Sequence, residues 1–243
     1  MCFGDDARPP PAPNQTAAGH RGSATLRSSD GSEFRVHYAH PAGSSQVGVV
    51  VLPDVRGLHR FYEQLAERFA EAGSHAIAID YFGRTAGVGP RGNDFPFRDH
   101  VEKMQPEQVD ADVATAVARL QGTAGSVFTV GFCLGGALSW RQSAMGHQLA
   151  GCVGFYGRPE RVTSLVERMQ APLLLLAAGQ DRTPVADVEA FAAQVREAGV
   201  EAEVHVYPEA PHSFFDRKYE EHREECDDAW LRILDFMERH ARA

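Results

Sequence analysis

The sequence predicts a three-layer α/β fold in which a mostly parallel sheet of eight strands lies between two layers of helices. Two observations support this prediction. Short apolar runs with the length of buried strands alternate with amphipathic segments along most of the chain, and this alternation is typical of a parallel sheet covered on both faces. Two further runs near the start surround a turn sequence, which adds an antiparallel hairpin to the sheet.

The strands are predicted from composition and length. Runs near 23–28 and 33–38 flank Ser29-Asp30-Gly31, a segment with the residues of a hairpin turn. Six further apolar runs have the length of buried strands and cover residues 47–52, 75–80, 126–131, 151–155, 172–178 and 202–207. Because helices separate most of these runs, we expect right-handed crossovers and parallel pairing among them.

The helices are predicted from apolar residues that recur at three- and four-residue spacing. Such stripes begin at Phe61, Val109, Val188 and Trp230. Pro184 has the type of residue that suits the first helical position before the third stripe. The connection 81–105 is long and contains several Gly and Arg residues, so we expect either a functional cover or a concealed short helix there.

The chain is expected to form one domain over residues 23–243. Residues 1–22 contain the segment Arg8-Pro-Pro-Pro-Ala-Pro-Asn and little that could be buried. We therefore predict a flexible, proline-rich arm, the alternative being a segment pinned across the body. No second linker and no internal repeat follow. A monomer and a dimer are both compatible with the sequence.

Composition excludes several functions. The net charge of -9 argues against a nucleic-acid partner, because phosphate binding needs a basic face. No apolar run is long enough to span a membrane. The four cysteines lack CxxC spacing and the first residues lack a secretory signal, so a reducing cytoplasm is the expected location. No metalloprotease, Walker or dinucleotide motif is present, and no metal or organic cofactor is expected.

The segment Gly131-Phe132-Cys133-Leu134-Gly135-Gly136 carries the main functional signal. It follows a strand-like run and precedes a helix-like one, which matches a nucleophile presented on a sharp strand-to-helix turn. Small residues two positions before and after the nucleophile allow neighbouring chain segments to pass closely. The amides at the start of the following helix favour the thiolate form of Cys133. A buried cysteine in a tight turn is the plainer interpretation of this pentapeptide alone.

A carboxylate and a histidine follow later predicted strands. Asp181 comes directly after the run 172–178, and His212 comes after the run 202–207. Successive parallel strands end at the same edge of a sheet, so we expect both side chains near Cys133. The order nucleophile, acid, histidine is that of α/β-hydrolases. Taken singly, Asp181 could cap a turn and His212 could be an ordinary loop residue.

With these residues the sequence resembles the dienelactone hydrolase family of the α/β-hydrolase superfamily, from about residue 23 to the C-terminus. The specific pieces are Gly-Phe-Cys-Leu-Gly-Gly at 131–136, Gln-Asp at 180–181 and Pro-His-Ser-Phe-Phe at 211–215, with support from segments 52–58 and 78–84. The resemblance implies a catalytic triad of Cys133, Asp181 and His212.

The resemblance also implies supporting groups. The backbone amides of Val55 and Leu134 would form the oxyanion hole. Asp54 falls where better-known members use a Glu to modulate the thiol, and it is one methylene shorter. Arg84 matches an anion-binding arginine of the family, and Arg217 lies one position later than a second such arginine.

These residues predict a carboxylic ester hydrolase that acts on a small ester or lactone through an acyl-cysteine. A carboxylate-bearing substrate is an alternative to a neutral one, because arginines gather in the predicted rim loops at Arg56, Arg84, Arg91 and Arg98. An acyltransferase or thioesterase would use the same triad. A ligand-binding or thiol-sensing protein would use the fold without catalysis.

Overall fold

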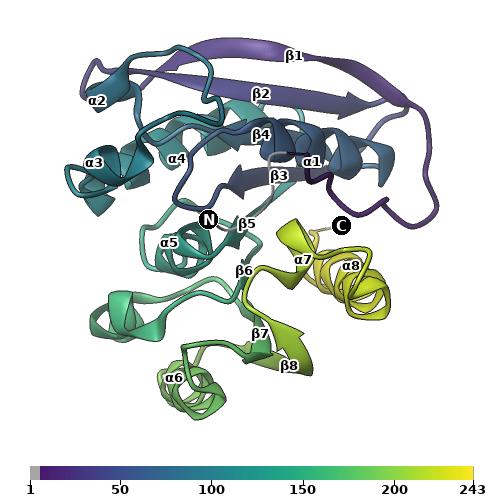
Figure 1. Cartoon of the computed structure of the whole chain (residues 1–243), viewed down its shortest axis with the longest axis vertical. Helices are drawn as coiled ribbons and strands as arrows, with labels where there is room; N and C mark the ends of the chain where they lie inside the picture. Colours follow the sequence, from purple (N-terminus) through teal and green to yellow (C-terminus); the bar gives the residue numbers. More distant parts are fainter. Residues whose placement is uncertain (1–5, 243) are drawn as a thin grey trace.

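The computed structural model describes residues 6–242. Its centre is an eight-stranded sheet in the order β1-β2-β4-β3-β5-β6-β7-β8 (Figure 1). β1 pairs antiparallel with β2, and β2 pairs antiparallel with β4, while all other neighbours are parallel. The strands are β1 Ala18–Arg27, β2 Glu33–Pro41, β3 Val47–Leu52, β4 His75–Ile79, β5 Ser126–Phe132, β6 Gly151–Phe155, β7 Leu173–Gln180 and β8 Ala202–Pro211. The predicted mostly parallel sheet with an N-terminal hairpin is confirmed.

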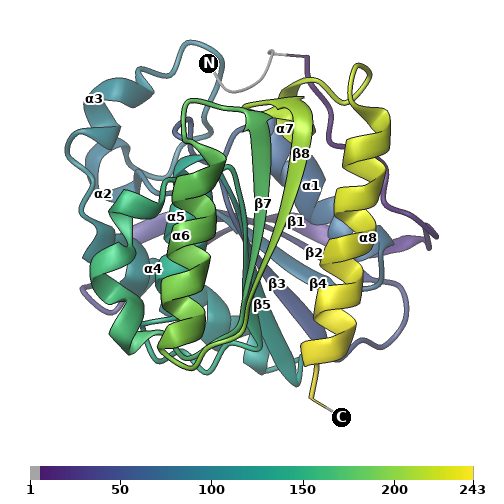
Figure 2. The same ribbon diagram turned by 90° about the horizontal axis from the view of Figure 1, so that it is seen from below.

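Helices cover both faces of the sheet, as Figure 2 shows. One layer holds α1 Arg60–Glu71 and α8 Arg223–His240, and the other holds α4 Pro106–Gln121, α5 Leu134–Gln142 and α6 Val185–Glu197. Side chains of a strand alternate between these layers: Val49 packs towards α1, and Val50 packs towards α4. None of the helices within the described residues is long and apolar enough to cross a bilayer.

The connection 81–105 contains two short helices, α2 Gly83–Ala86 and α3 Phe97–Val101. Shorter helical turns also follow two of the parallel strands: η1 Pro159–Arg161 and η2 Thr163–Arg168 come after β6, and α7 Phe214–Arg217 comes after β8. Of these segments, α2, α3 and α7, with the loops beside them, come directly after the carboxyl ends of strands β4 and β8. They are the parts of the fold that can shape a site at that edge.

The first described residues lie against the body of the protein. Pro9 and Pro10 are buried, and the amide of Thr16 donates a 2.8 Å hydrogen bond to the carbonyl of Glu71 at the end of α1. β1 then begins at Ala18, five positions before the predicted strand. The sheet therefore reaches into the range predicted to be an arm. The flexibility of that arm stays a prediction, and its first five residues lie outside the described part of the chain.

Candidate active site

Cys133 occupies a sharp bend between β5 and α5. Its backbone has φ 56° and ψ -111°, a conformation that L-residues rarely adopt. The neighbouring glycines make the bend possible. A Cβ atom on Gly135 would collide with the carbonyl oxygens of Leu52 and Pro53, and one on Gly131 would collide with the carbonyl oxygen of Gly135. The strained turn predicted for the nucleophile is therefore present, and small residues are required on both sides of it.

Cys133 differs from the other cysteines in the described residues. It is partly exposed, whereas Cys152 and Cys226 are completely buried. Burial raises the pKa of the Cys152 thiol to about 12, and burial also raises the pKa of Cys226. Cys133 immediately precedes the first turn of α5, where backbone amides favour a negative charge. Among these three thiols Cys133 has the surroundings that suit reaction, and Cys152 is part of the core, as its mid-strand position predicts.

The predicted acid and base meet through a hydrogen bond. Asp181 directly follows β7, His212 directly follows β8, and Nδ1 of His212 lies 2.7 Å from Oδ2 of Asp181. The carboxylate side chain is 6% exposed and the imidazole is 35% exposed. With Nδ1 held by the carboxylate, Nε2 is the ring nitrogen available for proton transfer. The pair has the geometry of a base and the group that orients it.

A buried carboxylate that the sequence analysis did not single out lies beside this pair. Asp216 in α7 is fully buried and accepts hydrogen bonds from the hydroxyls of Tyr62, at 3.0 Å, and Tyr156, at 2.9 Å. The Tyr156 ring lies 4.9 Å from the His212 ring between centroids. Burial, and then the negative charge of Asp54, raises the pKa of Asp216 to about 7. The only sequence signal was its position four residues after His212.

The expected oxyanion groups come from neighbouring segments. Leu134 is the first residue of α5, and Val55 lies in the loop that follows β3. The collision that a side chain at Gly135 would cause with Leu52 and Pro53 shows that the start of α5 lies directly against this loop. The two backbone segments are therefore adjacent beside Cys133. That the amides of Val55 and Leu134 point towards the carbonyl oxygen of a bound substrate stays a prediction.

Asp54 is completely buried in the same loop. Its Oδ1 accepts a 2.8 Å hydrogen bond from the amide of Arg56, which closes a tight local turn. The Tyr81 hydroxyl donates a 2.7 Å hydrogen bond to the carbonyl of Pro53. Burial raises the pKa of Tyr81, and the charges of Asp54, Asp80 and Cys133 raise it further. Asp54 therefore lies within electrostatic range of the reactive region.

The arginines of the predicted rim are mostly engaged with carboxylates or buried. Arg84 donates two hydrogen bonds to Asp112, at 2.7 and 2.9 Å, and one of 2.9 Å to Asp30. Arg91 likewise contacts Asp80 at 2.6 Å. Arg56 is buried, and Arg98 is exposed on α3. Arg84 thus ties α2 to α4 and to the hairpin turn, and its predicted contact with substrate stays a prediction.

Arg217, the second arginine implied by the family resemblance, is the last residue of α7. Its side chain lies outside the part of the chain that the structure describes. The predicted role of Arg217 in substrate binding therefore stays a prediction.

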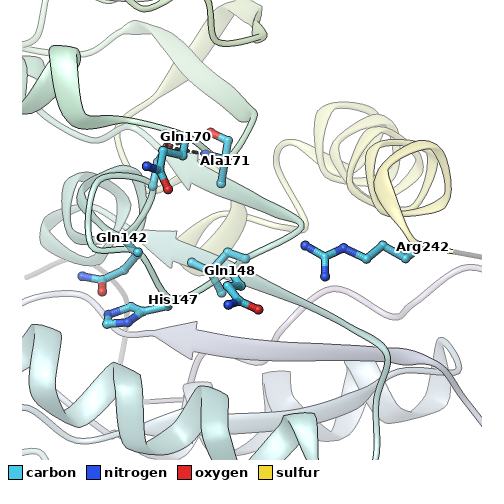
Figure 3. A pocket seen from close by; sticks show the side chains of 9 residues that line it. Gln142, His147, Gln148, Gln170, Ala171 and Arg242 are labelled. Carbon is cyan, nitrogen blue, oxygen red and sulfur yellow. Dashed lines mark hydrogen bonds between the residues drawn. The ribbon is translucent and has the colours of Figure 1, made fainter.

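Two cavities help to delimit the site. One of about 190 Å³ lies beside the start of α5 and is lined by Met104 from the 81–105 connection and by Leu134 and Leu138. The other, of about 230 Å³, lies between the end of α5 and the residues that follow α8 (Figure 3). Glutamine, histidine and arginine side chains surround this second cavity, and no predicted site residue lines it. Of these two cavities, the first is lined by one candidate oxyanion residue, Leu134.

Residues that could hold a metal ion lie away from Cys133. Glu201, Glu203 and His240 form the one group of this kind among residues 6–242, and Arg239 forms ion pairs with both glutamates. His222 and Cys226 are four residues apart, a spacing that metal ligands can have, but Cys226 is buried and its thiol lies 3.7 Å from the carbonyl of Phe214. The face of α8 that carries Cys226 packs against the core.

Comparison with known proteins yields consistent matches. The model of the dienelactone hydrolase family matches residues 34–241. A "Putative carboxymethylenebutenolidase" of Yersinia pestis is 30% identical over 244 residues, covering 93% of this chain and 91% of that protein. The carboxymethylenebutenolidase of Pseudomonas putida is 29% identical, covering 78% and 84%. A crystal structure of a "Putative Dienelactone Hydrolase" from Klebsiella pneumoniae has a TM-score of 0.74 and 27% identity, covering 90% of this chain and 98% of that one.

Proposed function

Because this chain belongs to the dienelactone hydrolase family, we propose that it hydrolyses a small ester or lactone through Cys133, His212 and Asp181. It is a hydrolase of the dienelactone hydrolase type. The observation that supports the triad is the 2.7 Å bond between His212 and Asp181, at the edge where Cys133 is presented on its strained turn. The Pseudomonas putida relative is by name a butenolidase, which opens a lactone, and we propose a carbonyl substrate of that class for this chain.

The first step is attack of the Cys133 sulfur on the substrate carbonyl carbon. His212 takes the thiol proton at Nε2, and Asp181 holds the imidazole in the required tautomer and stabilises the imidazolium. The carbonyl oxygen gains negative charge as the carbon–sulfur bond forms. The amides of Val55 and Leu134 would donate hydrogen bonds to that oxygen, each contributing about 3 kcal/mol to lowering the barrier.

Collapse of the tetrahedral intermediate breaks the carbon–oxygen bond of the ester. The leaving alkoxide receives the proton from the His212 imidazolium, and an acyl-cysteine remains. In a lactone the new hydroxyl stays attached to the acyl group. Water then attacks the thioester with His212 as its base, and the products are the carboxylic acid and the restored thiol. A thiol nucleophile must remain reduced, so we also propose a reducing cytoplasm as the location.

The decisive experiment combines turnover with detection of the covalent intermediate. Wild-type protein is mixed with a panel that includes dienelactone and nitrophenyl acetate, and intact mass is recorded within the first turnovers. We expect an added acyl group on Cys133 and none in Cys133→Ala. Cys152→Ala is the matched control, because that thiol is buried. Normal turnover by Cys133→Ala would overturn the triad.

The same experiment, with an alcohol or thiol acceptor added and a thioester included in the panel, separates the alternative functions. An acyltransferase would pass the acyl group to an added alcohol or thiol and leave the hydrolytic rate low. A thioesterase would act on thioesters in preference to the oxygen esters of the panel. A thiol sensor would show reversible modification of Cys133 without turnover.

A further inference from the structure

A cavity of about 390 Å³ lies between the N-terminal hairpin and the end of α4. We call it the hairpin groove and define it by Ala24 and Leu26 of β1, Val36 and Tyr38 of β2, and Leu120 of α4, with His20, His40 and Arg119 at one end. Its volume falls within the range of roughly 300–1,000 Å³ that ligand sites occupy. Its lining residues include none of the candidate catalytic residues.

The groove exists because the hairpin extends the sheet beyond the helices on one face only. On the opposite face α1 covers β1 and β2, and its glutamates pair with the hairpin's cations: Glu67 contacts Arg21 at 2.8 Å and Glu63 contacts Arg35 at 2.7 Å. On the groove face, the apolar side chains of Ala24 and Leu26 stay partly exposed. An apolar wall is therefore left open to a ligand.

Basic side chains gather at one end of the groove without acidic partners. The His20 ring lies 5.4 Å from the Tyr38 ring between centroids, and Nδ1 of His40 lies 2.8 Å from Nδ1 of His75. Burial lowers the pKa of His40, and the positive charges of His75, His20 and Arg119 lower it further. No carboxylate within residues 6–242 forms an ion pair with Arg119 or with any of the three histidines. In a chain with a net charge of -9, Arg119 places a positive charge at this end of the groove, and a histidine that becomes protonated there adds to it.

Strand register arranges the basic and apolar residues along a line. Ala24 pairs with Val36 and Gly22 pairs with Tyr38, so His20 and His40 lie at one end of the hairpin face and Leu26 lies at the other. His20 and Leu26 are six positions apart along the strand, which corresponds to roughly 20 Å. Gly22 makes room for the aromatic floor, because a Cβ atom there would lie 3.0 Å from the Tyr38 hydroxyl.

We propose that the hairpin groove binds a monocarboxylate with an apolar chain. Its carboxylate lies between Arg119 and the His20–His40 end, and its chain lies along Ala24 and Leu120 towards Leu26. A guanidinium suits a carboxylate because it can donate two parallel hydrogen bonds. The partly exposed aliphatic wall supplies the burial of the chain. The site is distinct from the catalytic one, since His75 begins β4 and Arg119 lies near the end of α4, at the amino side of the parallel strands.

The pH dependence of binding follows from the groups that face His40. These are His20 from β1, Tyr38 from its own strand, His75 from β4, and Arg119 from α4. A bound carboxylate offsets the repulsion among the cations and so raises the pKa of His40. Binding therefore takes up a proton, and affinity rises as the pH falls from about 8 to about 6.

The test is calorimetric titration of the full chain with octanoate at about pH 6 and about pH 8, with 1-octanol as the uncharged probe of the same length. Arg119→Gln should weaken octanoate binding by roughly tenfold, the effect of losing one hydrogen bond to a charged group. Arg21→Gln is the matched control, because Arg21 adjoins His20 on the same strand and faces α1. Cys133→Ala should bind octanoate as the wild type does, and 1-octanol should bind more weakly than octanoate.

Three results would overturn the proposal. Equal affinities of Arg119→Gln and the wild type for octanoate would show that the Arg119 guanidinium does not bind the carboxylate. Loss of binding in Cys133→Ala would place octanoate in the catalytic site. Failure of the wild type to bind octanoate at either pH would show that the groove does not hold this ligand. None of these results depends on whether the proposed triad is catalytic.

Discussion

The buried carboxylate beside the triad leads to a prediction for protein stability. Asp216 is fully buried, and its pKa is raised from 3.8 to about 7. A carboxyl whose pKa is raised by folding stabilises the fold fully below its unfolded pKa, and that contribution is lost as the pH rises through the folded pKa. The loss across this whole interval is roughly 4 kcal/mol, at about 1.36 kcal/mol for each pH unit. The side chain in Asp216→Asn cannot titrate, so this variant should not lose stability across the same pH interval.

The measurement is urea unfolding of both proteins at about pH 5 and about pH 8. Between these values the free energy of unfolding of the wild type should fall relative to that of Asp216→Asn by roughly 3 kcal/mol, because about two pH units of the interval lie above pH 5. The loss of one tyrosine–carboxylate hydrogen bond lowers the free energy of unfolding of the variant by an amount that does not change with pH. The change in the free energy of unfolding between the two pH values, compared between the wild type and the variant, therefore isolates the titration of Asp216.

Asp228→Asn is the matched control. Asp228 also accepts a tyrosine hydroxyl, from Tyr207 at 2.9 Å, but Arg232 contacts it at 2.6 Å. The pKa of Asp228 is lowered: burial opposes the shift, and the hydrogen bonds from Arg232 and Tyr207 outweigh burial. The stabilisation by Asp228 is therefore present at neutral pH and is lost in acid. This pH dependence has the opposite sign to that of Asp216. If Asp216→Asn and the wild type show parallel pH profiles across the measured range, the carboxyl is not held in its neutral form by burial.

Three further predictions follow from the site and its supports. Asp181→Asn should lower kcat by orders of magnitude in a nitrophenyl acetate assay, because His212 would adopt the wrong tautomer; unchanged kinetics would reduce Asp181 to a turn residue. Gly135→Ala should lower the melting temperature, since its Cβ would meet two carbonyl oxygens, whereas Gly122→Ala, whose Cβ has an ordinary 3.5 Å contact, should not. Arg84→Gln should lower the free energy of unfolding by about 3 kcal/mol in thermal unfolding, because the buried Asp112 carboxylate would lose the guanidinium that pairs with it. An unchanged melting temperature together with a raised KM would instead support a role of Arg84 in substrate binding.

The sequence predicts the parts of the molecule that depend on local pattern. Each buried strand is a short apolar run, so its approximate position follows from composition alone. The closeness of Asp181 and His212 also follows, because parallel strands end at one edge of the sheet and each residue directly follows a strand. The bend at Cys133 is predicted because glycines flank it at fixed spacing.

Other features depend on contacts between distant segments, which no local pattern contains. Arg84 pairs with Asp30 and Asp112, which lie 54 and 28 positions away in the chain. Asp216 is buried because Tyr62 of α1 and Tyr156 after β6 converge on it. Nothing in the spacing of these residues indicates that they meet. The start of β1 at Ala18 is similarly a result of pairing with β2 rather than of its own composition.

The two carboxylates near His212 interact with it in different ways. Asp181 binds Nδ1 of His212 directly and keeps the imidazole oriented at every pH at which it is ionised. Asp216 is linked to His212 through the Tyr156 ring and through its charge, and the charge of His212 in turn lowers the pKa of Asp216. Protonation of His212 and ionisation of Asp216 therefore favour each other. Because the pKa of Asp216 is raised to about 7, its ionisation near neutral pH changes the charge close to His212.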